Sequence, residues 1–90
     1  GGQTALEVGK CLKKLSVDRQ VLVVTHLAQV ASFADTHIKV TKNDSSDLPS
    51  IEIQSLNNDK RVIEISRMLS GSPDSENAQR HAIELLENAK

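Results

Sequence analysis

The fold of this chain is decided by Val21-Leu22-Val23-Val24-Thr25-His26-Leu27-Ala28-Gln29-Val30, an apolar run that ends at a threonine and a histidine and then continues with helical spacing. Residues 21–24 show no polar alternation, which predicts a strand covered on both faces, as in a parallel sheet. We therefore expect a buried strand over residues 20–25 that leads into a helix. In open α/β sheets ligands bind beyond the carboxyl ends of the strands, where Thr25 and His26 would lie.

The composition predicts one small domain with a weak core. Hydrophobic residues make up 38% of the 90 residues, but aromatic residues only 1%, which is Phe33 alone. A chain of this length buries only about 60–65% of the surface that it exposes when unfolded, and large rings usually anchor such small cores. Because the chain also begins Gly1-Gly2 without a methionine, we expect residues 1–90 to form a single, incomplete domain excised from a larger protein, or to retain residues of a tag.

Charge and cysteine content exclude several classes of protein. The 11 basic and 12 acidic residues give a net charge of −1, so no overall basic field attracts nucleic acid or an anionic membrane. The single Cys11 excludes an internal disulfide and is typical of a reducing compartment. Its neighbour Leu12 lies on an apolar helical pattern, so we expect Cys11 to pack in the core. Neither a signal peptide nor an apolar run of about 20 residues is present, and a cytoplasmic location is expected.

Helical patterns lie on both sides of the predicted strand. The first helix should begin at Thr4, because Thr4 and Glu7 have the spacing of a capping box, and should end within residues 16–19. A second, short helix should cover residues 27–34.

A pair of alternating segments follows. Residues 37–42 and 50–55 alternate polar and apolar side chains, which predicts two half-exposed strands that pair in antiparallel fashion. The polar residues 43–49 between them are expected to form a flexible hairpin loop.

The last third of the chain predicts two helices. Asn58 or Asp59 should cap the first of them, and Gly71 should end it. Ser72 and Pro73 should start the final helix, whose apolar side chains lie on one face: Ala78, Ala82, Leu85 and Ala89.

Three motifs carry a resemblance to a known family: Thr25-His26-Leu27-x-Gln29-Val30-Ala31; Ala34-Asp35-Thr36-His37 through Val40 to Lys42; and Arg61 through Glu64-Ile65-Ser66-Arg67-Met68-Leu69 to Gly71. They resemble the C-terminal end of the ABC-type ATPase head in the RecN family of bacterial DNA-repair proteins. The resemblance runs from about Gly1 to Lys90. The chain departs from the family at Ala28, where proline is common, and at Ser66, where alanine is common.

The resemblance implies a fold and a site. The fold would be part of an α/β ABC-ATPase (P-loop NTPase) head, with a parallel core strand flanked by helices plus a small β-hairpin. His26 would be the catalytic switch histidine that reaches the terminal phosphate of ATP, with Thr25 as a second nucleotide-binding residue. ATP and Mg²⁺ would bind only to the complete head, so the fragment alone would be inactive.

The resemblance also implies partners and a role. The partners would be the N-terminal part of the same head, a second head in a dimer, and DNA through the complete protein, but no membrane. The role would be recombinational repair of DNA double-strand breaks by a cytoplasmic, nucleoid-associated ATPase.

The chemistry of phosphoryl transfer explains the use of a histidine. Negative charge develops on the γ-phosphate oxygens, and a positioned N–H donor stabilises that charge. The Thr25 hydroxyl could support the turn or the phosphate shell, although a β-branched residue is also common at the end of a strand. The alternative from another class is a stand-alone α/β protein-interaction module in which His26 is structural and the hairpin or the last helix binds a protein.

Other motifs of an ATPase are missing from the sequence. It contains no G-x-x-x-x-G-K-[ST] phosphate loop and no strand that ends in adjacent acidic residues. Residues 69–72, Leu-Ser-Gly-Ser, resemble an ABC signature loop, but Pro73 lacks an N–H and the segment follows the histidine instead of preceding it. We expect a helix end there. His37 and His81 have no closely spaced partner for zinc, so no metal site is predicted.

Overall fold

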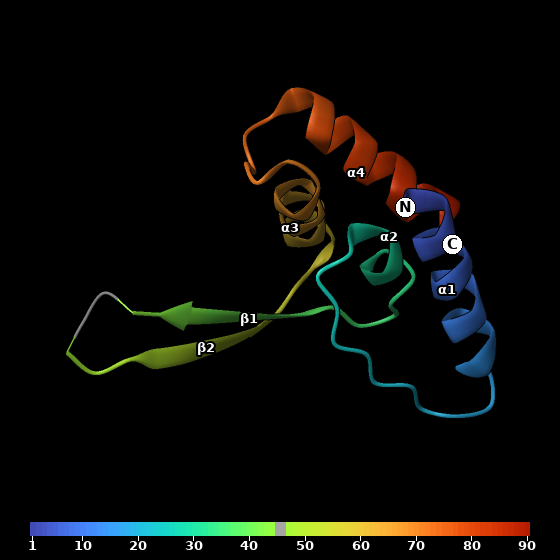
Figure 1. Ribbon diagram of the computed structural model, residues 1–90, viewed down its shortest axis with the longest axis horizontal. Helices are drawn as coiled ribbons and strands as arrows, with labels where there is room; N and C mark the ends of the chain where they lie inside the picture. The colour runs from blue at the N-terminus through green and yellow to red at the C-terminus, as the bar shows by residue number, and fades with distance from the viewer. Residues whose placement is uncertain (45–46) are drawn as a thin grey trace.

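The computed structural model describes residues 1–44 and 47–90. In chain order the elements are α1 (Gly2–Leu15), α2 (Ala28–Ala31), β1 (Ile38–Asn43), β2 (Ser50–Ser55), α3 (Asn58–Ser70) and α4 (Glu76–Asn88). Figure 1 shows that the helices gather into one body from which the β1–β2 hairpin projects. The Cα radius of gyration is 13.9 Å, against about 12 Å for a compact domain of this length, as a projecting hairpin requires.

The apolar segment at residues 21–24 is not a strand here, so the predicted parallel core strand is wrong for this chain by itself. Leu22 and Val24 are 89% and 97% exposed, and the segment has no regular secondary structure. In the part of the chain that the structure describes, the only strand pairing is between β1 and β2. A strand must pair its backbone N–H and C=O groups with a neighbour, and no neighbouring strand is supplied. The mixture of helices with a small hairpin agrees with the α/β prediction.

The predicted hairpin is confirmed to within one residue. β1 and β2 are antiparallel, with a register that runs from Ile38 opposite Ser55 to Asn43 opposite Ser50. Because opposed residues share a face, one face of the hairpin carries four exposed apolar side chains, together with Lys42 and Ser55: Ile38, Val40, Ile51 and Ile53. Of the loop predicted over residues 43–49, Ser45 and Ser46 lie outside the described residues.

The first two helices differ from their predicted bounds. Helix α1 begins at Gly2, so Thr4 lies inside it, and no side chain caps its start. The predicted capping box is therefore wrong, and Glu7 instead accepts a hydrogen bond from Gln3 at 3.2 Å. Helix α2 has four residues where eight were predicted, because a turn at Ser32 and Phe33 follows it directly.

The starts of the last two helices also shift. The Asn57 side chain caps α3 by accepting from the Lys60 N–H at 2.9 Å, one residue before the predicted cap. Gly71 ends α3 in the left-handed conformation, with φ 76°, as predicted. Helix α4 is capped by Ser75, which accepts from the Ala78 N–H at 3.2 Å. The prediction of Ser72 and Pro73 as the start is wrong, because both precede a turn at residues 73–74 and the helix begins only at Glu76.

The core is small and aliphatic, as the composition predicts. It is formed by Ala28, Ala31, Ile65, Ala82 and Leu85, with Leu6, Val62, Met68, Leu69 and Leu86 packed around them. The prediction of a buried Cys11 is wrong, since Cys11 is exposed. Helix α1 buries Ala5 and Gly9, and Cys11 lies about 200° around the helix from Gly9.

Candidate functional site

The predicted site residues lie in a tight turn before α2. The Thr25 Oγ1 accepts a hydrogen bond from the Leu27 N–H at 3.0 Å, which closes the turn over His26. Leu27 has extended backbone (φ −97°, ψ 118°) and caps α2, and its carbonyl accepts from the N–H groups of Val30 and Ala31 at 3.1 and 3.0 Å. The turn is thus continuous with the helix, and the Thr25 hydroxyl supports it, one of the roles that the sequence left open.

His26 is exposed at this turn, and Thr25 is half-buried. Among residues 1–44 and 47–90, no hydrogen bond or ion pair involves the His26 side chain. A histidine with a structural role is usually buried or hydrogen-bonded. The imidazole is therefore presented to its surroundings by a held turn and is not used to hold the fold of this chain.

The other end of α2 is held by Arg61 of α3. The Arg61 Nη2 donates to the carbonyl oxygens of Ala31 and Ser32, at 3.2 and 3.3 Å. Burial lowers the pKa of Arg61, and the nearby Asp35 carboxylate opposes that shift. Asp35 in turn pairs with Lys13 of α1. Helix α2 is thus fixed between α1 and α3, as Figure 1 shows.

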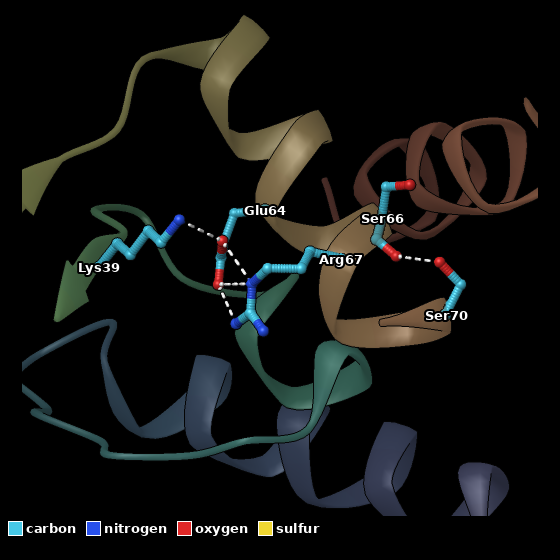
Figure 2. Close-up of polar contacts among 5 residues, drawn as sticks. All are labelled: Lys39, Glu64, Ser66, Arg67 and Ser70. Carbon is cyan, nitrogen blue, oxygen red and sulfur yellow. Dashed lines mark hydrogen bonds and ion pairs between the residues drawn. The ribbon is translucent and has the colours of Figure 1, made fainter. Parts of the chain in front are cut away.

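A charged network lies where the hairpin meets α3 (Figure 2). Glu64 is only 5% exposed. Its carboxylate accepts from the Arg67 Nε at 3.0 and 3.1 Å and pairs with the Lys39 Nζ at 3.1 Å. Burial acts to raise the pKa of Glu64, but the hydrogen bonds from Arg67 and Lys39 outweigh it, so the pKa is lowered. Since Lys39 belongs to β1, the network ties the hairpin to α3.

Three side-chain polar atoms are buried without a partner among the described residues. They are the Nδ1 of His37, the Nε of Arg61 and the Oγ of Ser66. Burial lowers the pKa of His37, as does the nearby Arg61, while Glu64 opposes the shift. The Ser66 carbonyl, by contrast, accepts from the Ser70 hydroxyl at 3.0 Å (Figure 2). The hydroxyl that distinguishes Ser66 from the common alanine thus makes no bond.

The described residues contain no group of three or more His, Cys, Asp or Glu side chains that could hold a metal ion. The segment that resembles a signature loop is a helix end, as predicted, because Gly71 is the C-cap of α3. His81 is exposed on α4. Within the described part of the chain, none of the helices has both the length and the apolar character needed to cross a membrane.

The sequence did not reveal how these polar residues meet. Glu64 and Arg67 have the i, i+3 spacing of a helical ion pair, which is a readable signal. Lys39 and the carbonyls bound by Arg61 come from other elements, some 25 to 30 residues away along the chain. Such contacts leave no local pattern in the sequence.

Comparison with known proteins identifies relatives of the whole chain. No family model matches it. The DNA repair protein RecN of Streptomyces coelicolor is 47% identical over 90 residues, which are 100% of this chain and 16% of that protein. RecN of Mycobacterium tuberculosis is 41% identical over 90 residues, 100% of this chain and 15% of that protein. RecN of Deinococcus radiodurans is 48% identical over 86 residues, 96% of this chain and 15% of that protein.

This similarity covers nearly the whole of the chain and one segment of each relative, each a DNA repair protein RecN. The family is RecN. The chain matches one segment of RecN over nearly all of its own length, which confirms the resemblance inferred from the motifs. The chain spans about one sixth of the length of the curated relatives that it matches.

Proposed function

We propose that this chain is the C-terminal segment of a RecN-like ATPase head and that it contributes His26, as the switch histidine, to an ATP site formed with other segments of that head. The observation that carries the proposal is the apolar segment at residues 21–24, whose Leu22 and Val24 are almost fully exposed, directly before the turn that presents His26. Burying a Val or Leu side chain contributes about 1.5–3 kcal/mol. Pairing of this segment with strands of the remaining head would recover that free energy and would bring His26 to the edge of the completed sheet.

The described residues fit only part of a nucleotide site. They provide an exposed imidazole and a threonine hydroxyl, but no cluster of side chains for Mg²⁺. The bound ATP supplies the γ-phosphate whose transfer to water is catalysed by the complete head. His26 would donate its N–H to an oxygen of that phosphate, where negative charge develops. The isolated chain should therefore have no ATPase activity.

Thr25 can serve both the turn and the nucleotide. Its oxygen accepts from the Leu27 N–H, and a hydroxyl that accepts one hydrogen bond still has its own proton to donate. That proton would be free for a phosphate oxygen or an ordered water beside His26. Thr25 thus positions the turn and is proposed as a second nucleotide-binding residue.

The surfaces left bare suggest the nearest partner. The apolar segment at residues 21–24 and the apolar face of the hairpin would both pack on the N-terminal part of the head. A second head would complete the ATP site, and DNA would bind through the complete protein. The name of the relatives supports a role in DNA repair, and within it we propose recombinational repair of double-strand breaks, in the cytoplasm at the nucleoid.

Two measurements test the proposal. The chain should associate with the N-terminal part of the head and restore ATP binding, measured by calorimetry. In the full-length protein, His26→Ala should lower kcat for ATP hydrolysis by about 100-fold, the scale of losing one preorganised donor, with little change in ATP binding. The exposed His81 offers the matched control, His81→Ala. Failure to associate, together with an unchanged kcat in His26→Ala, would favour the stand-alone interaction module.

A further inference from the structure

We propose that Arg61 is a positioning residue for His26 and that it acts by holding the carbonyl end of α2; this inference rests on the proposed function of His26. Arg61 lies in the first turn of α3, and its Nη2 donates to the Ala31 and Ser32 carbonyls at 3.2 and 3.3 Å. Those carbonyls belong to the last residue of α2 and to its C-cap. The exposed His26 lies just before the first turn of the same helix.

Helix α2 needs such support because it is so short. An isolated helix of four residues is not stable in water, since nucleation costs more than one turn of hydrogen bonds recovers. Its last carbonyls accept from the residues that follow the helix, as the Ala31 carbonyl does from the Ala34 N–H at 3.1 Å, and the Ser32 carbonyl beyond them lies outside that ladder. A guanidinium at the carboxyl end supplies donors for them, and its charge also interacts favourably with the helix dipole. Arg61 therefore adds, from α3, a second donor to the Ala31 carbonyl and a donor to the Ser32 carbonyl.

The geometry from Arg61 to His26 passes through one rigid turn. The Ser32 N–H donates to the Ala28 carbonyl at 2.9 Å, and the Ala31 N–H donates to the Leu27 carbonyl at 3.0 Å. The Leu27 N–H donates to the Thr25 hydroxyl across His26. These hydrogen bonds join Ser32 and Ala31 to Ala28 and Leu27, and Leu27 to Thr25 on the other side of His26, so a shift of Ser32 would move the backbone of His26.

Arg61 is anchored through Nη2, while its Nε is buried without a partner among the described residues. It is half-buried, and the Asp35 carboxylate lies close enough to oppose the effect of burial on its pKa. Asp35 pairs with Lys13 of α1. The loop after α2 is thus fixed to α1 while Arg61 fixes the end of α2 to α3. The arrangement resists rotation of α2, which would move the imidazole of His26.

The experiment uses the full-length protein that contains this chain. Arg61→Met removes the donors and keeps most of the aliphatic stem, while Arg61→Lys keeps the charge and one donor group. We expect Arg61→Met to lower kcat about tenfold, as a small misplacement of a catalytic group does, with ATP affinity within twofold of the parent. Arg61→Lys should recover most of kcat. The matched control is Arg67→Met, an arginine of the same helix that binds Glu64 and not α2.

The double variant His26→Ala/Arg61→Met separates this inference from the proposed function. If Arg61 acts through His26, the double variant should be no slower than His26→Ala alone. A multiplicative loss, or an unchanged kcat in Arg61→Met while His26→Ala is slow, would overturn the role of Arg61 and leave that of His26 intact. An unchanged kcat in His26→Ala would overturn both. Should Arg61→Met fail to fold, as judged by circular dichroism, Arg61→Gln replaces it in the same comparison.

Discussion

Replacing Leu22 by alanine would test whether the apolar segment at residues 21–24 is an interface with the remaining head. In the isolated chain Leu22 is 89% exposed, so the substitution removes almost no buried surface. It should change the free energy of unfolding by less than about 0.5 kcal/mol. In the completed head the same side chain would be buried on a sheet, where Leu→Ala costs about 2–5 kcal/mol. The lower bound corresponds to about 30-fold weaker association of the chain with the N-terminal part of the head.

The assay compares two measurements on the same variant. Urea denaturation of the isolated chain gives the change in stability, and calorimetric titration with the N-terminal part of the head gives the change in affinity. Ile65→Ala is the matched control, because Ile65 is 0% exposed and belongs to the core of the chain itself. It should destabilise the isolated chain by about 2–5 kcal/mol. Equal affinities of Leu22→Ala and the parent chain would refute the proposed burial of this segment.

Three further substitutions test the interior of the chain. The stability of the chain, measured as the urea midpoint, should fall in two steps as the pH is lowered. In the folded chain the pKa of His37 is lowered from 6.5, mainly by burial. The first step should therefore begin near pH 6.5 and end at the lowered pKa of His37, because over that range the unfolded chain binds the proton more tightly. The pKa of Glu64 is also lowered, from 4.5, although burial acts to raise it, so a second loss of stability should follow below pH 4.5. The substitution His37→Gln should remove the first step and leave the second. Ser66→Ala should stabilise the chain by about 1 kcal/mol and raise Tm by about 5 °C in thermal denaturation, since it deletes a buried hydroxyl without a partner. Gly9→Ala should destabilise the chain, because a Cβ at this position would lie 2.9 Å from the Phe33 Cε2. This clash should outweigh the gain in helix propensity of about 1 kcal/mol. An increase in the urea midpoint would contradict the prediction.

Features of the fold that depend on neighbours in sequence could be predicted. The period-two alternation predicted the hairpin to within one residue. Gly71 ends α3 because only a residue without a Cβ adopts a positive φ at little cost. Helix starts were less readable. Several residues in a row could act as caps, at Asn57 to Asp59 and again at Ser72 to Ser75, and the packing of the helix decides which one is used.

The surroundings of the candidate site could be predicted only in part. The turn at Thr25 and His26 was expected from the change of pattern at that point, and the structure adds that the threonine hydroxyl closes it. The contacts of Arg61 and Lys39 could not be predicted. Every residue has a backbone carbonyl, so an arginine that binds carbonyls can do so whatever the types of the residues that it contacts. A pair such as Lys39 and Glu64 depends on how the hairpin leaves the body of helices.

The failure of the predicted strand at residues 20–25 has a physical meaning of its own. An apolar run indicates that a segment is buried in its native surroundings. To form a strand, the segment must also have a neighbouring strand within hydrogen-bonding distance. The run at residues 21–24 satisfies the first condition and lacks the second in the described chain. Leu22 and Val24 are consequently among its most exposed apolar residues. A water-soluble protein does not normally leave such residues bare beside a positioned histidine. The segment that makes the fold prediction wrong for the chain alone is therefore the strongest argument for the proposal that other segments complete a site at His26.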